Sequence, residues 1–294
     1  MRKWLSWGVI FVLLPLPASA AKMVALINRD HPYWGNDYAT QYETQVFIEW
    51  AQNQGLDYQE IRGASSLEQV FQNLDQYEMI VVDTNAIRDG AGYNPLFHQY
   101  KGEIKRWVEN GGKLIVLGEY HAQVNPGTTG GDTGNAYEWL EVMGITGVWE
   151  GGQHTGHDVG WIKAGDPVFS GMTEQDLENS SAHPSGNNYW SVLRLVEGHP
   201  DADKWEILAK NEAGEILMAR GRFGRGVVLV TSWEIGYGQG AFGTLFTNTL
   251  TYAKNYGRRR PAPGPGLPEA LLVGLMALFC LAVVDAIRRR GKGA

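Results

Sequence analysis

The sequence predicts an α/β protein built on an open parallel sheet with helices on both faces. Short apolar runs alternate with longer segments of helical periodicity through the first 118 residues, and turn residues separate them. This alternation is the pattern of β-α-β units, in which a helix returns the chain to begin the next parallel strand. The second half departs from this pattern and predicts antiparallel strands added to the same sheet.

The first half is predicted to contain four strands and three helices in alternation. The strands are apolar or alternating runs at residues 23–28, 57–61, 78–84 and 113–118. The helices are expected at 38–55, 66–77 and 95–112, where apolar side chains recur every three or four residues. Gly55 is expected to end the first helix, and Ser66 to cap the second.

The second half is less regular. A short helix is expected at 136–145, and the glycine-rich segment 146–172 contains strand-like pieces. Antiparallel strands are predicted within 189–198 and 205–232, with a hairpin turn at Asn211 to Gly214. The stretch GRGVVLVTS is expected to return to the main sheet, before a closing helix at 240–257.

The amino terminus is predicted to be a secretory signal peptide, residues 1–20. Arg2 and Lys3 precede a short apolar run, and Ala18-Ser19-Ala20 has the spacing of a cleavage site. The apolar run is short for a membrane span, which needs about 20 residues. An uncleaved anchor is the alternative.

The carboxyl terminus predicts a membrane anchor. A Pro/Gly-rich linker (257–268) leads to an expected transmembrane helix (269–288) and a basic tail (289–294). This arrangement predicts a single-pass protein of the cytoplasmic (inner) membrane, with its main domain (22–256) extracytoplasmic, or periplasmic. The alternatives are a buried helix and a sorting signal cut by a protease of the exosortase or rhombosortase type, although the Pro-Glu-Pro motif is absent.

Composition limits the chemistry of the main domain. The net charge of −7 argues against a nucleic-acid partner. Cys280, the only cysteine, lies in the expected membrane helix, so the exported domain has no disulfide, cysteine nucleophile or cysteine metal site. His154, His157 and Asp158 have a spacing that zinc ligands can have, but a solvated glycine-rich loop is the simpler interpretation. We therefore expect no metal and no cofactor.

Polar and aromatic residues follow several of the predicted parallel strands. Ligands of open parallel sheets bind at the carboxyl ends of the strands. The candidate ligand-binding residues are Asp30, His31, Trp34, Asp83, Asn85, Trp233 and Glu234. Glu119 and His121 are the tentative catalytic pair, as a carboxylate and an imidazole suited to general acid-base work. The alternative is that acids such as Asp83 cap helices and bind loop amides.

The segment RWVENGGKLIVLGEYHA resembles the region of the fourth strand in class I glutamine amidotransferase-like domains, which have a flavodoxin-like fold. It is closest to their ThuA-like (trehalose-utilisation-like) branch and to related membrane-anchored bacterial domains. In that branch a Gly-Gly pair precedes the strand and a histidine follows it, here Gly111, Gly112 and His121. GDPVFSGM resembles a further element of the branch, with Asp166 in place of a histidine, and RFGRGVVLVTS resembles its Gly-x-Gly strand. The resemblance covers about residues 22–256.

The chain also departs from the family pattern. A working amidotransferase has Gly-x-Cys-x-Gly after this strand, and a later histidine and glutamate activate the cysteine. Here Gly118-Glu119-Tyr120-His121 occupies the region, and Glu234 has no histidine before it. Glutaminase activity is therefore excluded.

These observations predict a membrane-anchored, extracytoplasmic domain with a non-catalytic role. Its expected partner is a ligand, such as a carbohydrate, or another protein of the cell envelope, and the many tryptophans in predicted loops suit sugar stacking. The alternative is a hydrolase that acts on a glycan or envelope substrate with Glu119 and His121.

Overall fold

The computed structural model describes residues 22–28, 38–118, 122–149, 159–178, 191–232, 235 and 240–257. The chain divides into two units, Met1–Tyr256 and Gly257–Ala294. All the helices and strands given below belong to the first unit.

Five parallel strands form the centre of the sheet. They are β1 (Met23–Ile27), β2 (Tyr58–Ile61), β3 (Tyr77–Asp83), β4 (Lys113–Leu117) and β10 (Gly226–Thr231). Their order across the sheet is β2-β1-β3-β4-β10, and every neighbouring pair in this row is parallel. The predicted parallel sheet is thus confirmed, including the return of GRGVVLVTS beside β4.

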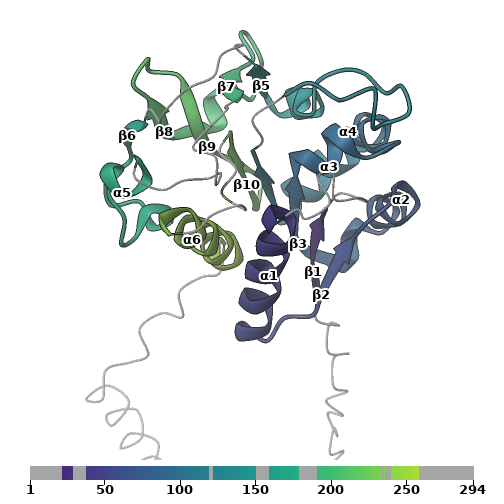
Figure 1. The fold of residues 1–294 in the computed structure, drawn as a ribbon, viewed down its shortest axis with the longest axis horizontal. Coiled ribbons are helices and arrows are strands. Elements are labelled where there is room, and N and C mark those ends of the chain that lie inside the picture. Colours follow the sequence, from purple (N-terminus) through teal and green to yellow (C-terminus); the bar gives the residue numbers. More distant parts are fainter. Residues whose placement is uncertain are drawn as a thin grey trace, which may run out of the picture. The chain divides into compact units, whose positions relative to one another are not determined.

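Helices cover both faces of this sheet (Figure 1). The long ones are α1 (Tyr38–Asn53), α2 (Ala64–Gln72), α4 (Tyr93–Glu109) and α6 (Ala241–Asn255). Buried side chains of α1 and α6 share one hydrophobic core, and those of α2 and α4 share the other. The sheet therefore lies between two helical layers, as the alternation of strands and helices predicted.

The strands divide their side chains between the two cores. In β1, Ala25 and Ile27 face the core of α2 and α4, whereas Val24 and Leu26 face the core of α1 and α6. This follows from the two-residue period of a strand. Because both faces are buried, the strand is apolar at every position rather than at alternate ones.

The second half extends the sheet with antiparallel strands. These are β5 (Ile145–Trp149), β6 (Val159–Ile162), β7 (Ser191–Leu195), β8 (Trp205–Asn211) and β9 (Ile216–Phe223). β9 pairs antiparallel with β10 and β8, and the expected turn at Asn211–Gly214 joins β8 to β9. Shorter helices connect the strands: η1 (Leu74–Gln76), η2 (Glu138–Met143), η3 (Pro167–Phe169), α5 (Glu174–Glu178) and η4 (Ala202–Lys204).

The start of the second helix and one additional helix differ from the prediction for physical reasons. Ser66 does not cap the second helix, because α2 already begins at Ala64, after Gly63 with φ of 85°. The backbone N–H of Gly63 is bound by the phenol of Tyr93, a residue distant in sequence, and this contact sets the start of the helix. The short helix α3 (Thr84–Asp89) was also not predicted, since six residues give too little periodicity to detect.

Gly112 and Gly226 belong to the two glycine motifs on which the ThuA-like resemblance rests, and both lie where the chain approaches other residues closely. A Cβ on Gly112 would lie 2.4 Å from the ring of Trp107, and one on Gly226 would lie 2.0 Å from the carbonyl oxygen of Val108. The turn between α4 and β4 therefore packs directly against the start of β10. These positions are glycine because there is no room for a side chain, rather than because a ligand contacts them.

Asp166, which stands where the ThuA-like pattern has a histidine, forms a buried ion pair. Its carboxylate accepts hydrogen bonds from the Arg220 guanidinium at 2.8 and 3.3 Å, and also accepts the backbone N–H of Val168 at the start of η3. Arg220 also donates to Glu206 and lies over the ring of Tyr252 in α6. The contacts of Arg220 thus hold β9 against η3 and α6.

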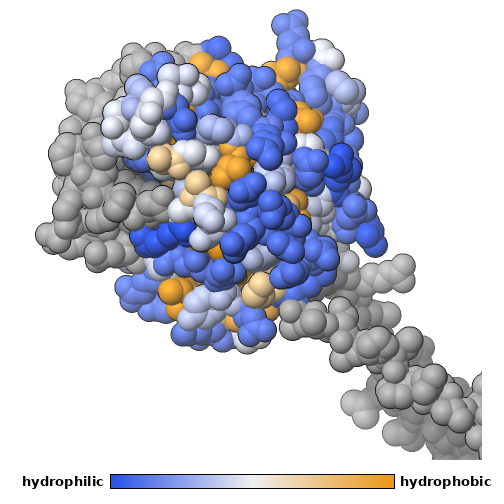
Figure 2. All heavy atoms as spheres, turned by 90° about the vertical axis from the view of Figure 1, so that its right-hand side faces the viewer, coloured by the Kyte–Doolittle hydropathy of each residue, from blue (hydrophilic) through white to orange (hydrophobic). Residues whose placement is uncertain are grey.

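The surface that carries α2 is mostly hydrophilic, with apolar residues scattered singly (Figure 2). Among the helices that the structure describes, none is long and apolar enough to cross a membrane. The expected signal peptide and transmembrane helix lie outside the described residues.

Candidate functional site

The parallel strands bring their carboxyl ends to one edge of the sheet. From β1 the chain crosses to β2 on one side, and it later returns to β3 on the other side of β1. The gap between the ends of β1 and β3 is therefore the switch point of the sheet, where ligands of such folds bind. Of the predicted candidate residues, the structure places Asp83 and Asn85 at this point.

Asp83 ends β3 and caps the short helix α3. Its Oδ1 accepts the backbone N–H of Asn85 at 2.8 Å, so the alternative role foreseen for this acid, helix capping, is confirmed. Next to it, the hydroxyl of Thr84 donates to the carbonyl of Leu117 in β4 at 2.9 Å. These bonds fix the tip of β3 against the tip of β4.

Asn85 has a different character. Its side chain is 1% exposed, yet within the described part of the chain neither its amide nitrogen nor its amide oxygen has a hydrogen-bond partner. A buried amide without partners costs about 1–3 kcal/mol, and native proteins seldom keep one without a reason. The group can both donate and accept, so it suits a polar ligand that does the same.

Two further buried polar side chains belong to the end of β1 and to α1, the helix that contacts β1. Asn28 directly follows β1, is fully buried, and donates from its amide to Thr44 of α1 at 2.9 Å and to Glu60 of β2 at 3.2 Å. Glu43 precedes Thr44 in the first turns of α1 and is 2% exposed. We call Asn28, Glu43, Asp83 and Asn85 the strand-tip cluster.

Glu43 is not among the predicted site residues, although the sequence carries a signal for it. It lies four residues before Phe47 and seven before Trp50, so it belongs to the apolar face of α1. An acid is seldom buried on the apolar face of a helix unless it is paired, so Glu43 is a residue that the pattern could have singled out.

Tyr93 joins the elements around the cluster. Its phenol is fully buried, donates to the carbonyl of Asn28 at 3.1 Å, and accepts the N–H of Gly63 at 2.5 Å. One hydroxyl thereby connects β1, the turn before α2, and the first residue of α4.

Replacing Tyr93 with phenylalanine is expected to lower the free energy of unfolding by about 1–3 kcal/mol, because the buried carbonyl of Asn28 and the partly buried N–H of Gly63 lose their partner. Urea unfolding followed by tryptophan fluorescence measures the change. The matched control is Tyr100→Phe, whose partly exposed hydroxyl makes only long contacts of 3.4 and 3.5 Å. That change should cost about 0.5 kcal/mol or less, and equal losses in the two variants would contradict the role given to Tyr93.

The ends of β4 and β10 meet at the same edge. A Cβ on Gly118 would lie 2.2 Å from the carbonyl carbon of Ser232, so only glycine lets the two strands approach in this way. Ser232 is fully buried, and its backbone N–H donates to the carbonyl of Leu217 at 2.8 Å. The predicted meeting of the strand ends is thus confirmed for β1, β3, β4 and β10.

The other predicted site residues lie outside the described residues. They are Asp30, His31, Trp34, Glu119, His121, Trp233 and Glu234. The hydrolase alternative therefore stays a prediction. The loop histidines His154 and His157 also lie outside, and in the described part of the chain no group of three or more His, Cys, Asp or Glu side chains could hold a metal ion.

The strand order and the helices on both faces define the class: a flavodoxin-like α/β fold with an antiparallel extension. No known protein-family model matches the sequence, and no curated protein matches it either.

Several solved structures are similar to the chain. A ThuA-like protein from Bacteroides uniformis has 11% identity and a TM-score of 0.47, with 82% of this chain and 95% of that one covered. A GMP synthase component from Thermoplasma acidophilum has 10% identity and a TM-score of 0.44, with 81% and 97% covered. An exo-β-1,4-mannosidase from an Opitutaceae bacterium has 13% identity and a TM-score of 0.38; the match covers 81% of this chain and 35% of the mannosidase. The fold assignment rests on the strand order rather than on these likenesses.

Proposed function

We propose that this protein is a membrane-anchored, extracytoplasmic domain of the ThuA-like branch that binds a polar ligand at the strand-tip cluster without glutaminase chemistry. The buried, unpartnered amide of Asn85 at the switch point is the observation that carries this proposal. The only cysteine of the chain, Cys280, lies beyond the α/β domain, so the domain lacks a thiol nucleophile.

The ligand that best fits this site is a neutral carbohydrate. Sugar hydroxyls donate and accept at once, as the amide of Asn85 does. Asn28 and Asp83 are held in place by the bonds described above, so this part of the site is preorganised and loses little entropy on binding. A protein partner in the envelope is the other class of ligand that the cluster would serve.

The membrane anchor is proposed from the sequence alone. The apolar run at 269–288, between a Pro/Gly-rich linker and a cluster of arginines, supports a single span in the inner membrane. The amino-terminal basic and apolar pattern supports export of the domain.

The test is a thermal-shift screen of the full chain in mild detergent, against neutral mono- and disaccharides and cell-wall fragments. A ligand at a hundred times its Kd adds about 2.7 kcal/mol of stability, which is roughly 5–10 °C for a domain of this size. Asn85→Leu is expected to abolish the shift. It should leave the ligand-free protein as stable as the parent or more so, because it removes an amide that lacks partners.

The control is Thr249→Val, which removes a buried hydroxyl that donates to the carbonyl of Leu245 in α6, away from the strand tips. It should lower the melting temperature of the ligand-free protein and leave the ligand shift unchanged. The proposal fails if no sugar or cell-wall fragment shifts the parent protein, or if Asn85→Leu keeps the full shift.

A further inference from the structure

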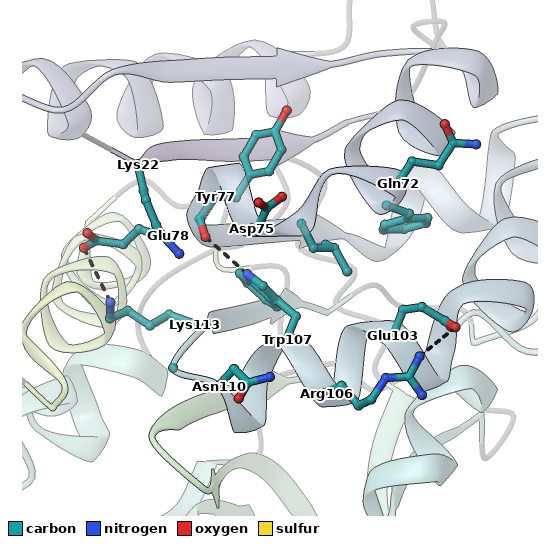
Figure 3. A pocket seen from close by; sticks show the side chains of 14 residues that line it. Lys22, Gln72, Asp75, Tyr77, Glu78, Glu103, Arg106, Trp107, Asn110 and Lys113 are labelled. Carbon is teal, nitrogen blue, oxygen red and sulfur yellow. Dashed lines mark hydrogen bonds and ion pairs between the residues drawn. The ribbon is translucent and has the colours of Figure 1, made fainter. Parts of the chain in front are cut away.

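A cavity of about 440 Å³ opens at the amino edge of the sheet, opposite the strand-tip cluster (Figure 3). The end of α2 and the short helix η1 form one side of the cavity. The starts of β3 and β4 and the last turns of α4 form the rest of its wall. The seven residues of β3 separate the two edges, which at 3.3 Å per residue is about 20 Å. The cavity is therefore a separate site from the one proposed above.

The inner wall of the cavity is apolar and fixed. Phe71, Leu74, Tyr77 and Trp107 line it and are between 4% and 8% exposed. The indole N–H of Trp107 donates to the carbonyl of Tyr77 at 3.2 Å, so the ring is held in one orientation. Charges that lie against such a wall attract one another more strongly than they do in open water.

Charged side chains surround the opening, and most of them are paired. Lys113 Nζ lies 3.5 Å from Glu78 Oε1, and Arg106 donates to Glu103 at 2.9 Å. These two pairs are drawn as dashed lines in Figure 3.

Three polar side chains of the lining have no such partner among the described residues: the ammonium of Lys22, the carboxylate of Asp75 and the amide of Asn110. All three are exposed, and Figure 3 shows them around the same opening as Trp107. The lining therefore offers a ligand one cation, one anion and one amide. An anion alone would meet Asp75, and a cation alone would meet Lys22, so a ligand with a single charge gains on one side and loses on the other.

We propose that the amino-edge cavity binds a small zwitterion, with its primary ammonium on Asp75 and its acidic group on Lys22. The amide of Asn110 would bind a remaining polar atom, and the wall of Trp107 and Tyr77 would receive the carbon skeleton. The volume falls within the range of small-molecule pockets, about 300–1,000 Å³. Two sources share this chemistry, a free amino acid and a phosphoethanolamine headgroup.

The test is isothermal titration of the full chain in a zwitterion-free, non-ionic detergent, with L-alanine, L-glutamate and O-phosphoethanolamine as probes. Two analogues each remove one charge: N-acetyl-alanine lacks the ammonium, and alanine amide lacks the carboxylate. We expect at least one zwitterion to bind. Both single-charge analogues should bind about fivefold more weakly than that zwitterion, as the loss of one exposed ion pair implies. Whichever zwitterion binds more tightly identifies the source.

Two variants test whether Asp75 binds the ammonium of the zwitterion and Lys22 binds its acidic group. Asp75→Asn should weaken binding of the zwitterion about fivefold and should not weaken binding of N-acetyl-alanine, which has no ammonium for Asp75 to bind. Lys22→Gln should likewise weaken binding of the zwitterion about fivefold and should not weaken binding of alanine amide, which has no carboxylate for Lys22 to bind. The matched controls are Glu212→Gln and Lys101→Gln, exposed residues that do not line the cavity. Both should bind the zwitterion as the parent does.

The strand-tip variant Asn85→Leu should also bind the zwitterion normally, so failure of the sugar proposal would not affect this one. The proposal is overturned if no zwitterion binds, if the single-charge analogues bind equally well, or if Asp75→Asn and Lys22→Gln behave as their controls do.

Discussion

Replacing Arg220 with methionine is expected to lower the free energy of unfolding by about 3–5 kcal/mol. The side chain of Arg220 is 4% exposed and that of Asp166 is 3% exposed, so the substitution leaves a buried carboxylate without its cation. Removing one partner of a buried pair costs this much because the remaining charge stays desolvated. Urea unfolding followed by tryptophan fluorescence gives the free energy.

The control is Arg222, two residues further along β9. It donates to the same Glu206 carboxylate at 3.1 Å, but its side chain is 57% exposed. Arg222→Gln should therefore cost less than about 1 kcal/mol. A double-mutant cycle with Asp166→Asn measures the interaction energy between the two side chains apart from their other contacts. We expect the double variant to lose less free energy of unfolding than the sum of the two single losses. A loss for Arg220→Met no larger than that of Arg222→Gln would contradict the structural role of the pair.

Tyr252 gives a second readout of the same substitution. Burial raises the pKa of its phenol above the ordinary value, and the nearby Arg220 partly offsets this by stabilising the phenolate. The guanidinium carbon of Arg220 lies 4.7 Å from the ring centroid. Arg220→Met should therefore raise the pKa of Tyr252 further, as an ultraviolet titration of the phenolate would show. A simple loss of packing would not shift this titration in that direction.

The parallel half of the fold could be predicted because each strand carries its own signal. β3 and β4 are buried on both faces, so they read as continuous apolar runs, and glycines or polar residues mark their ends. The helices between them have a clear apolar face. Where local signals were short, as in α3, or where a tertiary contact decided, as with the Tyr93 phenol at the start of α2, the sequence could not give the boundary.

The buried polar groups were harder to predict for a physical reason. Arg220 lies in the mostly buried strand β9, and its partner Asp166 is 54 residues earlier in the chain. Pairing of this kind leaves no periodic trace. Asp83 and Asn85 could be placed because they lie at the carboxyl end of a strand that the sequence predicts. Glu43 lies in a helix, and its position depends on how α1 packs beside β1.

Gly118 at the end of β4 is the residue whose change should most disturb the strand-tip edge. Gly118→Ala would place a methyl group 2.2–2.5 Å from the backbone of Ser232, which is not a flexible side chain that can move aside. The tips of β4 and β10 must separate, and the bond from the Thr84 hydroxyl to the carbonyl of Leu117 lies next to the displaced residue. We expect a loss of about 3 kcal/mol in the free energy of unfolding, at the upper end for overpacking.

The same chain offers a glycine at which the opposite result is expected. Gly102 lies within α4, and a Cβ there would meet no atom within 4 Å. Gly102→Ala should stabilise the protein by roughly 0.5–1 kcal/mol, because alanine loses less backbone entropy in a helix. Urea unfolding of the two variants side by side compares one added methyl group in two surroundings. If Gly118→Ala were as stable as the parent, the close approach of β4 and β10 would be wrong, and with it the compact strand-tip edge on which the proposed ligand site depends.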